Sequence, residues 1–233
     1  MTAPAGTAQE KITAYWNESA ARANGTPHRT MRDEPERSAW LDALRGLLPP
    51  APADVVDLGT GTGLLAFRCA ELGHRVIGFD LSEGMLAGRH LSYTGPMPQP
   101  PDFRIGDAGD PPLPPSSVDV VATCNVLWTL LDPVKAFQNW RTVLRPGGRV
   151  LAIHMGTPGR NQGRGAETYT EDVVARLAPI RWCPSLDPAR EYAEQTGYTD
   201  ITVTRLDRIE RFYRERDSRE NVWLALTALK PAA

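Results

Sequence analysis

Residues 55–63 read VVDLGTGTG, an apolar run that ends in a turn with three glycines. The pattern predicts a β-strand whose turn opens a helix, because glycine lets a chain turn sharply and pass close to a ligand. The N-terminus of such a helix presents unpaired N–H groups and partial positive charge, which suit a carboxylate or a phosphate. We therefore expect a ligand at this turn, with a plain turn as the alternative.

On both sides of the turn, short apolar runs alternate with helical stretches. This alternation is typical of βαβ units and predicts a parallel sheet. Strands are predicted at 55–58, 75–79, 103–105, 118–123 and 149–154, and helices at 64–72, 82–89 and 133–144. Residues 201–206 and 222–229 predict a hairpin-like pair of strands at one edge. The sequence thus predicts one α/β domain, Rossmann-like and doubly wound, with a mostly parallel seven-stranded sheet.

The residues outside this core predict a covered site. Helical patterns at 7–24 and 33–48 lead us to expect an N-terminal helical lid over residues 1–50, in front of a ligand-binding core at 51–155. Residues 156–233 are expected to supply helices and edge strands after a mobile loop at 156–168.

Composition narrows the class of protein. The net charge of −2 and the pI near 6.1 give no basic field for nucleic acid. The three cysteines lack a paired ligand spacing, which disfavours a disulfide framework and a structural zinc. No apolar run is long enough to span a membrane, and the first residues lack the features of a signal peptide. We expect a cytoplasmic monomer or homodimer.

Asp80 ends the second predicted strand, about 20 residues after the glycine turn, where a carboxylate accepts both hydroxyls of a ribose. Its alternative role is to cap the next helix, but Ser82 suits that role better. The third glycine of the dinucleotide GxGxxG pattern is replaced by Leu64, which disfavours NAD(P) and favours another adenosine-containing ligand.

Four further motifs follow in order, at residues 77–80, 106–108, 118–128 and 144–150. With residues 55–63, they resemble the class I SAM-dependent methyltransferases, in the small-molecule branch similar to the ubiquinone/menaquinone-type enzymes. The resemblance implies S-adenosyl-L-methionine as cofactor and S-adenosylhomocysteine as product.

The resemblance also implies roles for individual residues. It places the methionine moiety against Asp57, Gly59, Thr60, Gly61 and Gly63, with Tyr15 closing over it. It places the ribose at Asp80 and the adenine between Leu81, Asp107 and the Ala108 amide, with Asn125 beside the sulfonium. In many relatives Tyr-Asp stands at Ala23-Asn24 and Arg-His at Cys124-Asn125, so the acceptor cannot be carried over from them.

The residues that would contact the methyl acceptor are inferred from the sequence itself and not from the resemblance. His28 and His154 are candidates for a base, each with a plain polar role as the alternative. Trp16 and Trp128 are candidates for the wall of an acceptor pocket, with core packing as their alternative. Trp40 and Trp140 are assigned to packing, and Cys124 is interpreted as an inert buried thiol.

We therefore expect a metal-independent N- or O-methyltransferase that acts on a small molecule by proximity and orientation, in specialised metabolite biosynthesis. The alternatives are a catalytically silent SAM-fold binding module and a nucleotide-cofactor oxidoreductase.

Overall fold

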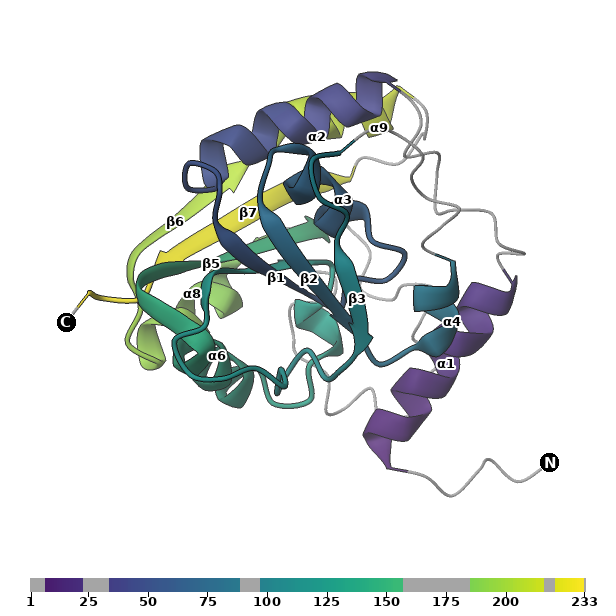
Figure 1. Cartoon of the computed structure of the whole chain (residues 1–233), viewed down its shortest axis with the longest axis horizontal. Coiled ribbons are helices and arrows are strands. Elements are labelled where there is room, and N and C mark those ends of the chain that lie inside the picture. Colours follow the sequence, from purple (N-terminus) through teal and green to yellow (C-terminus); the bar gives the residue numbers. More distant parts are fainter. Residues whose placement is uncertain (1–6, 23–33, 89–96, 157–184, 216–220, 233) are drawn as a thin grey trace.

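The computed structural model describes residues 7–22, 34–88, 97–156, 185–215 and 221–232. They form a seven-stranded sheet in the order β3-β2-β1-β4-β5-β7-β6, with helices on both faces (Figure 1). The strands are β1 (Asp54–Leu58), β2 (Arg75–Asp80), β3 (Asp102–Ile105), β4 (Val118–Cys124), β5 (Leu144–Gly156), β6 (Thr199–Arg205) and β7 (Val222–Leu229). The five strands β1 to β5 pair in parallel, and β7 runs antiparallel to β5 and β6. The Rossmann-like prediction is confirmed.

The described helices connect these strands or precede them. They are α1 (Ala8–Arg22), α2 (Glu34–Leu47), α3 (Leu64–Glu71), α4 (Glu83–Ala87), α6 (Pro133–Val143), α8 (Asp187–Gln195) and α9 (Asp207–Arg214), with a single 3-10 turn, η1 (Leu127–Thr129). The pairing of the last two strands was predicted correctly. The predicted hairpin-like connection between them is wrong, because α9 lies between β6 and β7 in the chain. β6 by itself forms this edge of the sheet, with β7 beside it.

Two apolar layers enclose the sheet, because successive strand residues point to opposite faces. Val56 and Ala152 face the layer of α6 and α8, where Phe137 and Trp140 are fully buried. On the opposite face of the sheet, Val55 and the other strand residues that point to that side pack against α2, α3 and α9. Trp40 and Trp140 are therefore core residues, as the sequence predicted.

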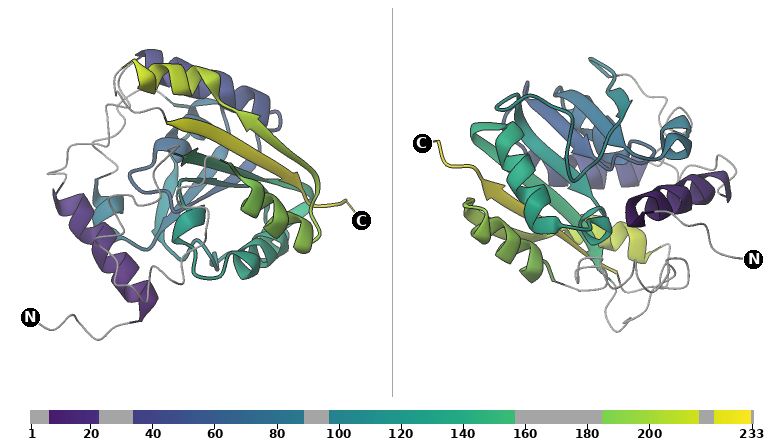
Figure 2. Two further views of the ribbon diagram at one scale, coloured as in Figure 1. Left: turned by 180° about the vertical axis from the view of Figure 1, so that it is seen from behind. Right: turned by 90° about the horizontal axis from the view of Figure 1, so that it is seen from below.

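The structure corrects the extent of the predicted lid. α2 lies along α9 on one face of the sheet (Figure 1), and its Trp40 and Leu44 are completely buried among β-strand side chains. Removing α2 would expose that core, so α2 belongs to the sandwich. Of the described part of the predicted lid, α1 is the helix that lies outside the sandwich, beside α4 and away from the main layers (Figures 1 and 2).

α1 has a small apolar contact of its own, in which Ala8 and Ile12 pack against Trp16, Trp128 and Leu131. The predicted loop at 156–168 lies outside the described residues, except for Gly156 at the end of β5. None of the described helices is both long enough and apolar enough to cross a membrane.

Candidate active site

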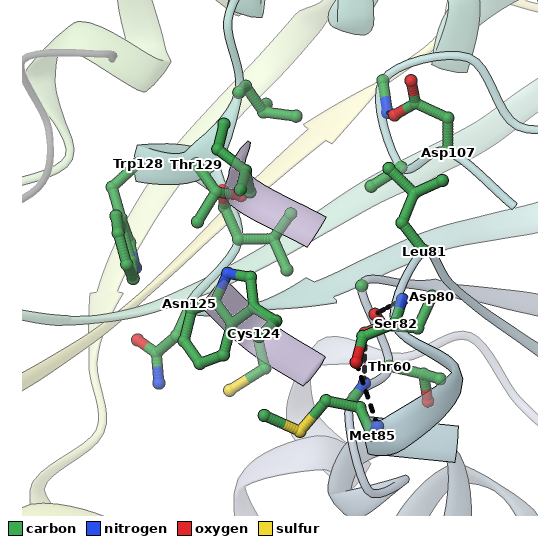
Figure 3. Close-up of a pocket in the computed structure, with 18 of the residues that line it drawn as sticks. Thr60, Asp80, Leu81, Ser82, Met85, Asp107, Cys124, Asn125, Trp128 and Thr129 are labelled. Atoms are coloured by element: carbon green, nitrogen blue, oxygen red, sulfur yellow. Dashed lines mark hydrogen bonds between the residues drawn. The ribbon is translucent and has the colours of Figure 1, made fainter. Parts of the chain in front are cut away.

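A cavity of about 880 Å³ opens at the carboxyl ends of β1, β2 and β4, under α1 (Figure 3). Ligands of open α/β sheets bind at this edge, where the strand order reverses. Small-molecule sites commonly measure about 300–1,000 Å³, so this cavity lies near the upper end of that range.

The glycine turn forms one wall of the cavity, and its three glycines have different tasks. All three have positive φ, at 64° for Gly59, 57° for Gly61 and 91° for Gly63. A Cβ on Gly59 would lie 2.4 Å from Val126, so this glycine permits close packing. A Cβ on Gly61 would meet nothing within 4 Å, because Gly61 borders the open cavity.

Asp57 lies beneath this turn and is only 1% exposed. Its Oδ2 accepts hydrogen bonds from Thr60 Oγ1 at 2.6 Å and from Ala66 N at 3.1 Å. Its Oδ1 has no hydrogen-bond partner within the described part of the chain. Burial raises the pKa of this carboxyl to about 7, and the charge of nearby Asp80 adds to the effect. An unpaired buried carboxylate is costly, so this position favours a cationic ligand group.

Asp80 connects the glycine turn to the start of α4. Its Oδ2 accepts from Gly61 N and its Oδ1 from Ser82 N, both at 2.8 Å (Figure 3). Each oxygen keeps a lone pair, so the fixed carboxylate can still accept two ligand hydroxyls. Ser82 caps α4 by accepting from Met85 N at 3.0 Å, which leaves Asp80 free of the capping role.

The turn after β3 forms the next wall. Asp107 Oδ1 accepts from Gly109 N at 2.8 Å, and the carbonyl of Ala108 accepts from Trp140 Nε1 at 2.7 Å. α6 thereby holds the turn in place. Asp107, Ala108 and Leu81 line this side of the cavity. Figure 3 shows Asp107 and Leu81 on the same side of it.

Asn125 follows β4 in the left-handed region, at φ 59°, which asparagine tolerates better than most residues. Its N–H donates to Ile153 O at 2.8 Å, and its Oδ1 accepts from Met155 N at 2.7 Å. Asn125 is thus fixed between β4 and β5 at the centre of the cavity wall (Figure 3).

The other half of the cavity is aromatic. Trp16 of α1 and Trp128 of η1 lie with their ring centroids 5.9 Å apart. Tyr213 and Trp223 also line the cavity and stack at 5.2 Å with an interplanar angle of 16°. The sequence analysis missed this second pair.

The family comparison agrees with this geometry. Residues 56–152 match the methyltransferase domain, which includes the glycine turn, Asp80, Asp107 and Asn125. Over these residues the chain is similar to the methyltransferase domain family. The NAD(P) alternative is therefore disfavoured by the sequence match as well as by Leu64.

Curated relatives of the chain include methyltransferases named for menaquinone and ubiquinone. The chain is 32% identical over 153 residues to a demethylmenaquinone methyltransferase of Clavibacter sepedonicus, covering 65% of this chain and 61% of that protein. It is 36% identical over 119 residues to a ubiquinone biosynthesis O-methyltransferase of Cupriavidus pinatubonensis, covering 50% and 46%. The chain thus spans about half to three fifths of these two relatives.

Solved structures share the fold. A phosphoethanolamine N-methyltransferase of Haemonchus contortus, in complex with phosphomonomethylethanolamine and S-adenosylhomocysteine, superposes with a TM-score of 0.62 at 23% identity. The superposition covers 83% of this chain and 52% of that one.

The predicted site residues divide into those that line the cavity and those that do not. Those that line the cavity are Asp57, Gly59, Thr60, Gly61, Asp80, Leu81, Asp107, Ala108, Asn125, Trp16 and Trp128. Tyr15, Gly63 and His154 do not line it, and His28 lies outside the described residues.

Each of the three exceptions has a local cause. Tyr15 packs edge-on against Trp16 at 5.1 Å, and Trp16 takes the position at the cavity. A Cβ on Gly63 would meet Phe67 at 2.8 Å and Phe103 at 2.9 Å, so Gly63 serves helix packing. His154 is 1% exposed and alternates along β5 with Met155, which does line the cavity. His154 therefore lies outside the lining of this cavity.

Cys124 lines the cavity, but burial raises the pKa of its thiol well above the usual range. The thiol therefore stays protonated, as expected of an inert cysteine. Within the described ranges, no group of three or more His, Cys, Asp or Glu side chains is placed to hold a metal ion.

Proposed function

We propose that the chain binds S-adenosyl-L-methionine and transfers its methyl group to a small organic acceptor. The observation that carries the proposal is the carboxylate of Asp80, which two backbone N–H groups hold at the cavity wall between the glycine turn and Leu81. This is the position and chemistry that recognise a ribose.

The remaining cofactor groups also find matching partners. Asp57 suits the ammonium of the methionine moiety, because its buried Oδ1 lacks a donor among the described residues. The open space at Gly61 lets the ligand approach the backbone. Asp107 and Ala108 face the position of the adenine.

When bound, S-adenosyl-L-methionine supplies an electrophilic methyl group on a positively charged sulfur. The chain's own residues position the acceptor: Asn125 is fixed at the junction of the two halves, and Trp16 and Trp128 exclude water from one side. Holding an acceptor lone pair in line with the methyl group supplies much of the acceleration in such a displacement. The proposed reaction therefore needs no metal ion.

The acceptor is a small molecule in this proposal, since a cavity of about 880 Å³ suits one and the net charge of −2 does not suit nucleic acid. The named relatives act on quinone precursors, which supports an aromatic metabolite. N- or O-methylation in specialised metabolism is the reaction we infer.

The test is to titrate the protein with S-adenosyl-L-methionine and with NADH by calorimetry, and then to measure S-adenosylhomocysteine formed with pools of phenols, quinols and amines. We expect binding of the first ligand only, and product that depends on an acceptor. Binding without turnover in any pool would favour the silent binding module, and tighter binding of NADH would reject the proposal.

A further inference from the structure

The cavity needs a proton acceptor if its substrate carries a hydroxyl, and few described side chains qualify. Asp57, Asp80 and Asp107 belong to the cofactor half. Asp110 and Asp132 are exposed at the rim, where Asp132 caps α6 by accepting from Lys135 N at 2.9 Å. Three other titratable residues line the described cavity. Lys135 is exposed and Cys124 is a protonated thiol, which leaves Tyr213.

Tyr213 belongs to a buried polar chain that crosses from α9 to α2. Its hydroxyl donates to Glu36 Oε1 and accepts from Trp40 Nε1 at 3.5 Å. A phenolic oxygen has two lone pairs, so one remains for a ligand hydroxyl. Tyr213 thus connects the cavity to a carboxylate behind it.

Glu36 is a buried carboxylate of α2 that accepts the hydrogen bond of Tyr213. It is 1% exposed, and its contact with Tyr213 joins α2 to α9, which lie side by side (Figure 1). Burying a carboxylate costs several kcal/mol unless partners compensate for it. The Tyr213 hydroxyl is one such partner, and it lies between Glu36 and the cavity-lining ring of Tyr213.

The elements around Tyr213 hold it firmly. Its ring stacks on Trp223, whose backbone N–H donates to Glu210 Oε1 at 2.9 Å, and Glu210 in turn accepts from Arg205 Nη2 at 2.8 Å. The titratable groups that act on Tyr213 electrostatically are Glu36 and, more weakly, Cys124. Burial, reinforced by Glu36, raises the pKa of Tyr213, so the phenol is protonated and donates to the carboxylate.

We propose that Tyr213, backed by Glu36, takes the proton of a hydroxyl-bearing aromatic acceptor during methyl transfer. The inference rests on the proposed function and names the class of acceptor, a phenol or a related hydroxyarene that fits between the two aromatic pairs. An acceptor oxygen forms a bond to the methyl carbon as the carbon–sulfur bond breaks, and that bonding pair stays on sulfur. The acceptor's proton moves to Tyr213 Oη, and the proton of Tyr213 moves to the Glu36 carboxylate, so charge and atoms balance.

The first experiment measures binding and needs no turnover. Dissociation constants of para-cresol and toluene are measured by calorimetry on protein saturated with S-adenosylhomocysteine. Wild-type protein is expected to bind para-cresol about 10-fold more tightly than toluene, since only cresol can donate to Tyr213. Tyr213→Phe should reduce this ratio to about 2-fold or less.

Tyr198→Phe is the matched control. Tyr198 is also a buried tyrosine, with its hydroxyl bonded to Phe137 O at 3.1 Å, but it does not line the cavity. The Tyr198→Phe variant should therefore leave the ratio of para-cresol to toluene affinity unchanged.

The second experiment separates proton transfer from packing. In Glu36→Gln the amide oxygen still accepts the tyrosine hydroxyl, so para-cresol affinity should stay within about 3-fold of wild type. Its methylation rate near neutral pH should fall about 10²-fold or more. The deficit should shrink as the pH approaches about 10, where a phenol ionises without help.

An unchanged affinity ratio in Tyr213→Phe overturns the inference, as does a Glu36→Gln rate that equals wild type at every pH. Failure of both probes to bind while S-adenosylhomocysteine binds also overturns it and leaves the proposed function standing. If S-adenosylhomocysteine itself does not bind, the proposed function fails first.

Discussion

Asn17 Oδ1 on α1 accepts a hydrogen bond from Ser82 Oγ at 2.7 Å and another from Gly84 N at 3.1 Å. Ser82 in turn donates its backbone N–H to Asp80. α1 is thereby connected to the carboxylate that we assign to the ribose. The same close approach explains Gly84, where a Cβ would lie 3.2 Å from Ala20.

We predict that Asn17→Ala weakens cofactor binding without unfolding the protein. The change removes two hydrogen bonds worth roughly 0.5–1.5 kcal/mol each, and α1 lies outside the main core. Calorimetry should show S-adenosyl-L-methionine affinity reduced about 5- to 20-fold, with Tm nearly unchanged. Asn17→Asp keeps an acceptor oxygen and should recover most of the affinity. Equal losses in both variants would show that the contact is not a hydrogen-bonded latch.

Asp80→Ala should cost on the order of 2–3 kcal/mol of S-adenosyl-L-methionine affinity, because a charged acceptor for two hydroxyls is lost. Asp80→Asn should keep part of that affinity. Asp102→Ala is the matched control, since Asp102 is an exposed strand carboxylate that pairs with Arg104 away from the cavity. Unchanged binding by Asp80→Ala in a calorimetric titration would refute the ribose assignment.

Gly61→Val tests whether the turn approaches the ligand. Gly61 and Gly147 both have positive φ, 57° and 77°, and both have open space at the Cβ position, but only Gly61 borders the cavity. Valine at either position should cost about 1–2 kcal/mol of folding stability through backbone strain. Only Gly61→Val should abolish cofactor binding. Thermal unfolding and calorimetry on the pair measure both effects, and equal binding by the two variants would exclude this turn as the cofactor site.

The local spacing of residues explains which parts could be predicted. The glycine turn, Asp80 and Ser82 follow one another along the chain, and short-range rules for strands, turns and caps place them correctly. Tyr213 meets Glu36 only because α9 packs on α2, and nothing near either residue in the sequence indicates that contact.

The roles of two other parts of the chain could not be predicted from the hydrophobic pattern of the sequence. The apolar stripe of residues 34–47 indicates a helix with one buried face, but the same stripe fits a lid and a core layer. His154 ends an apolar strand, and alternation alone does not tell which face of the sheet holds the cavity. The partner elements decide both questions, and they come from distant parts of the chain.

The pKa of Asp57, raised to about 7, predicts a pH dependence of cofactor binding. The folded protein holds this proton more tightly than an unfolded chain with the ordinary value of 3.8, so this group's contribution to stability falls as the pH rises from about 4 to about 7. A ligand ammonium favours the ionised carboxylate. Binding of S-adenosyl-L-methionine should therefore strengthen from about pH 5 to about pH 8 and release protons below about pH 7.

Calorimetry in buffers of different ionisation enthalpy measures that release. Asp57→Asn keeps an oxygen for Thr60 and Ala66 but cannot titrate, so it should lose the part of the pH dependence centred near 7. Wild-type affinity that does not change with pH would show that Asp57 does not face the ammonium.

Removing residues 1–30 should leave a folded core that binds S-adenosyl-L-methionine weakly and transfers almost no methyl groups. Both main apolar layers are built from residues after α1, so Tm should fall by only a few degrees. The truncation removes Asn17, which holds the Ser82 turn, and Trp16, which packs beside Trp128 in the cavity wall. Water then reaches the reacting groups, and the acceptor loses one wall of its pocket.

Trp16→Ala in the full-length chain separates these two effects, since it opens the acceptor half of the cavity while Asn17 stays in place. It should reduce transfer far more than cofactor affinity, and a truncated protein that turns over at the full-length rate would show that α1 is not a lid.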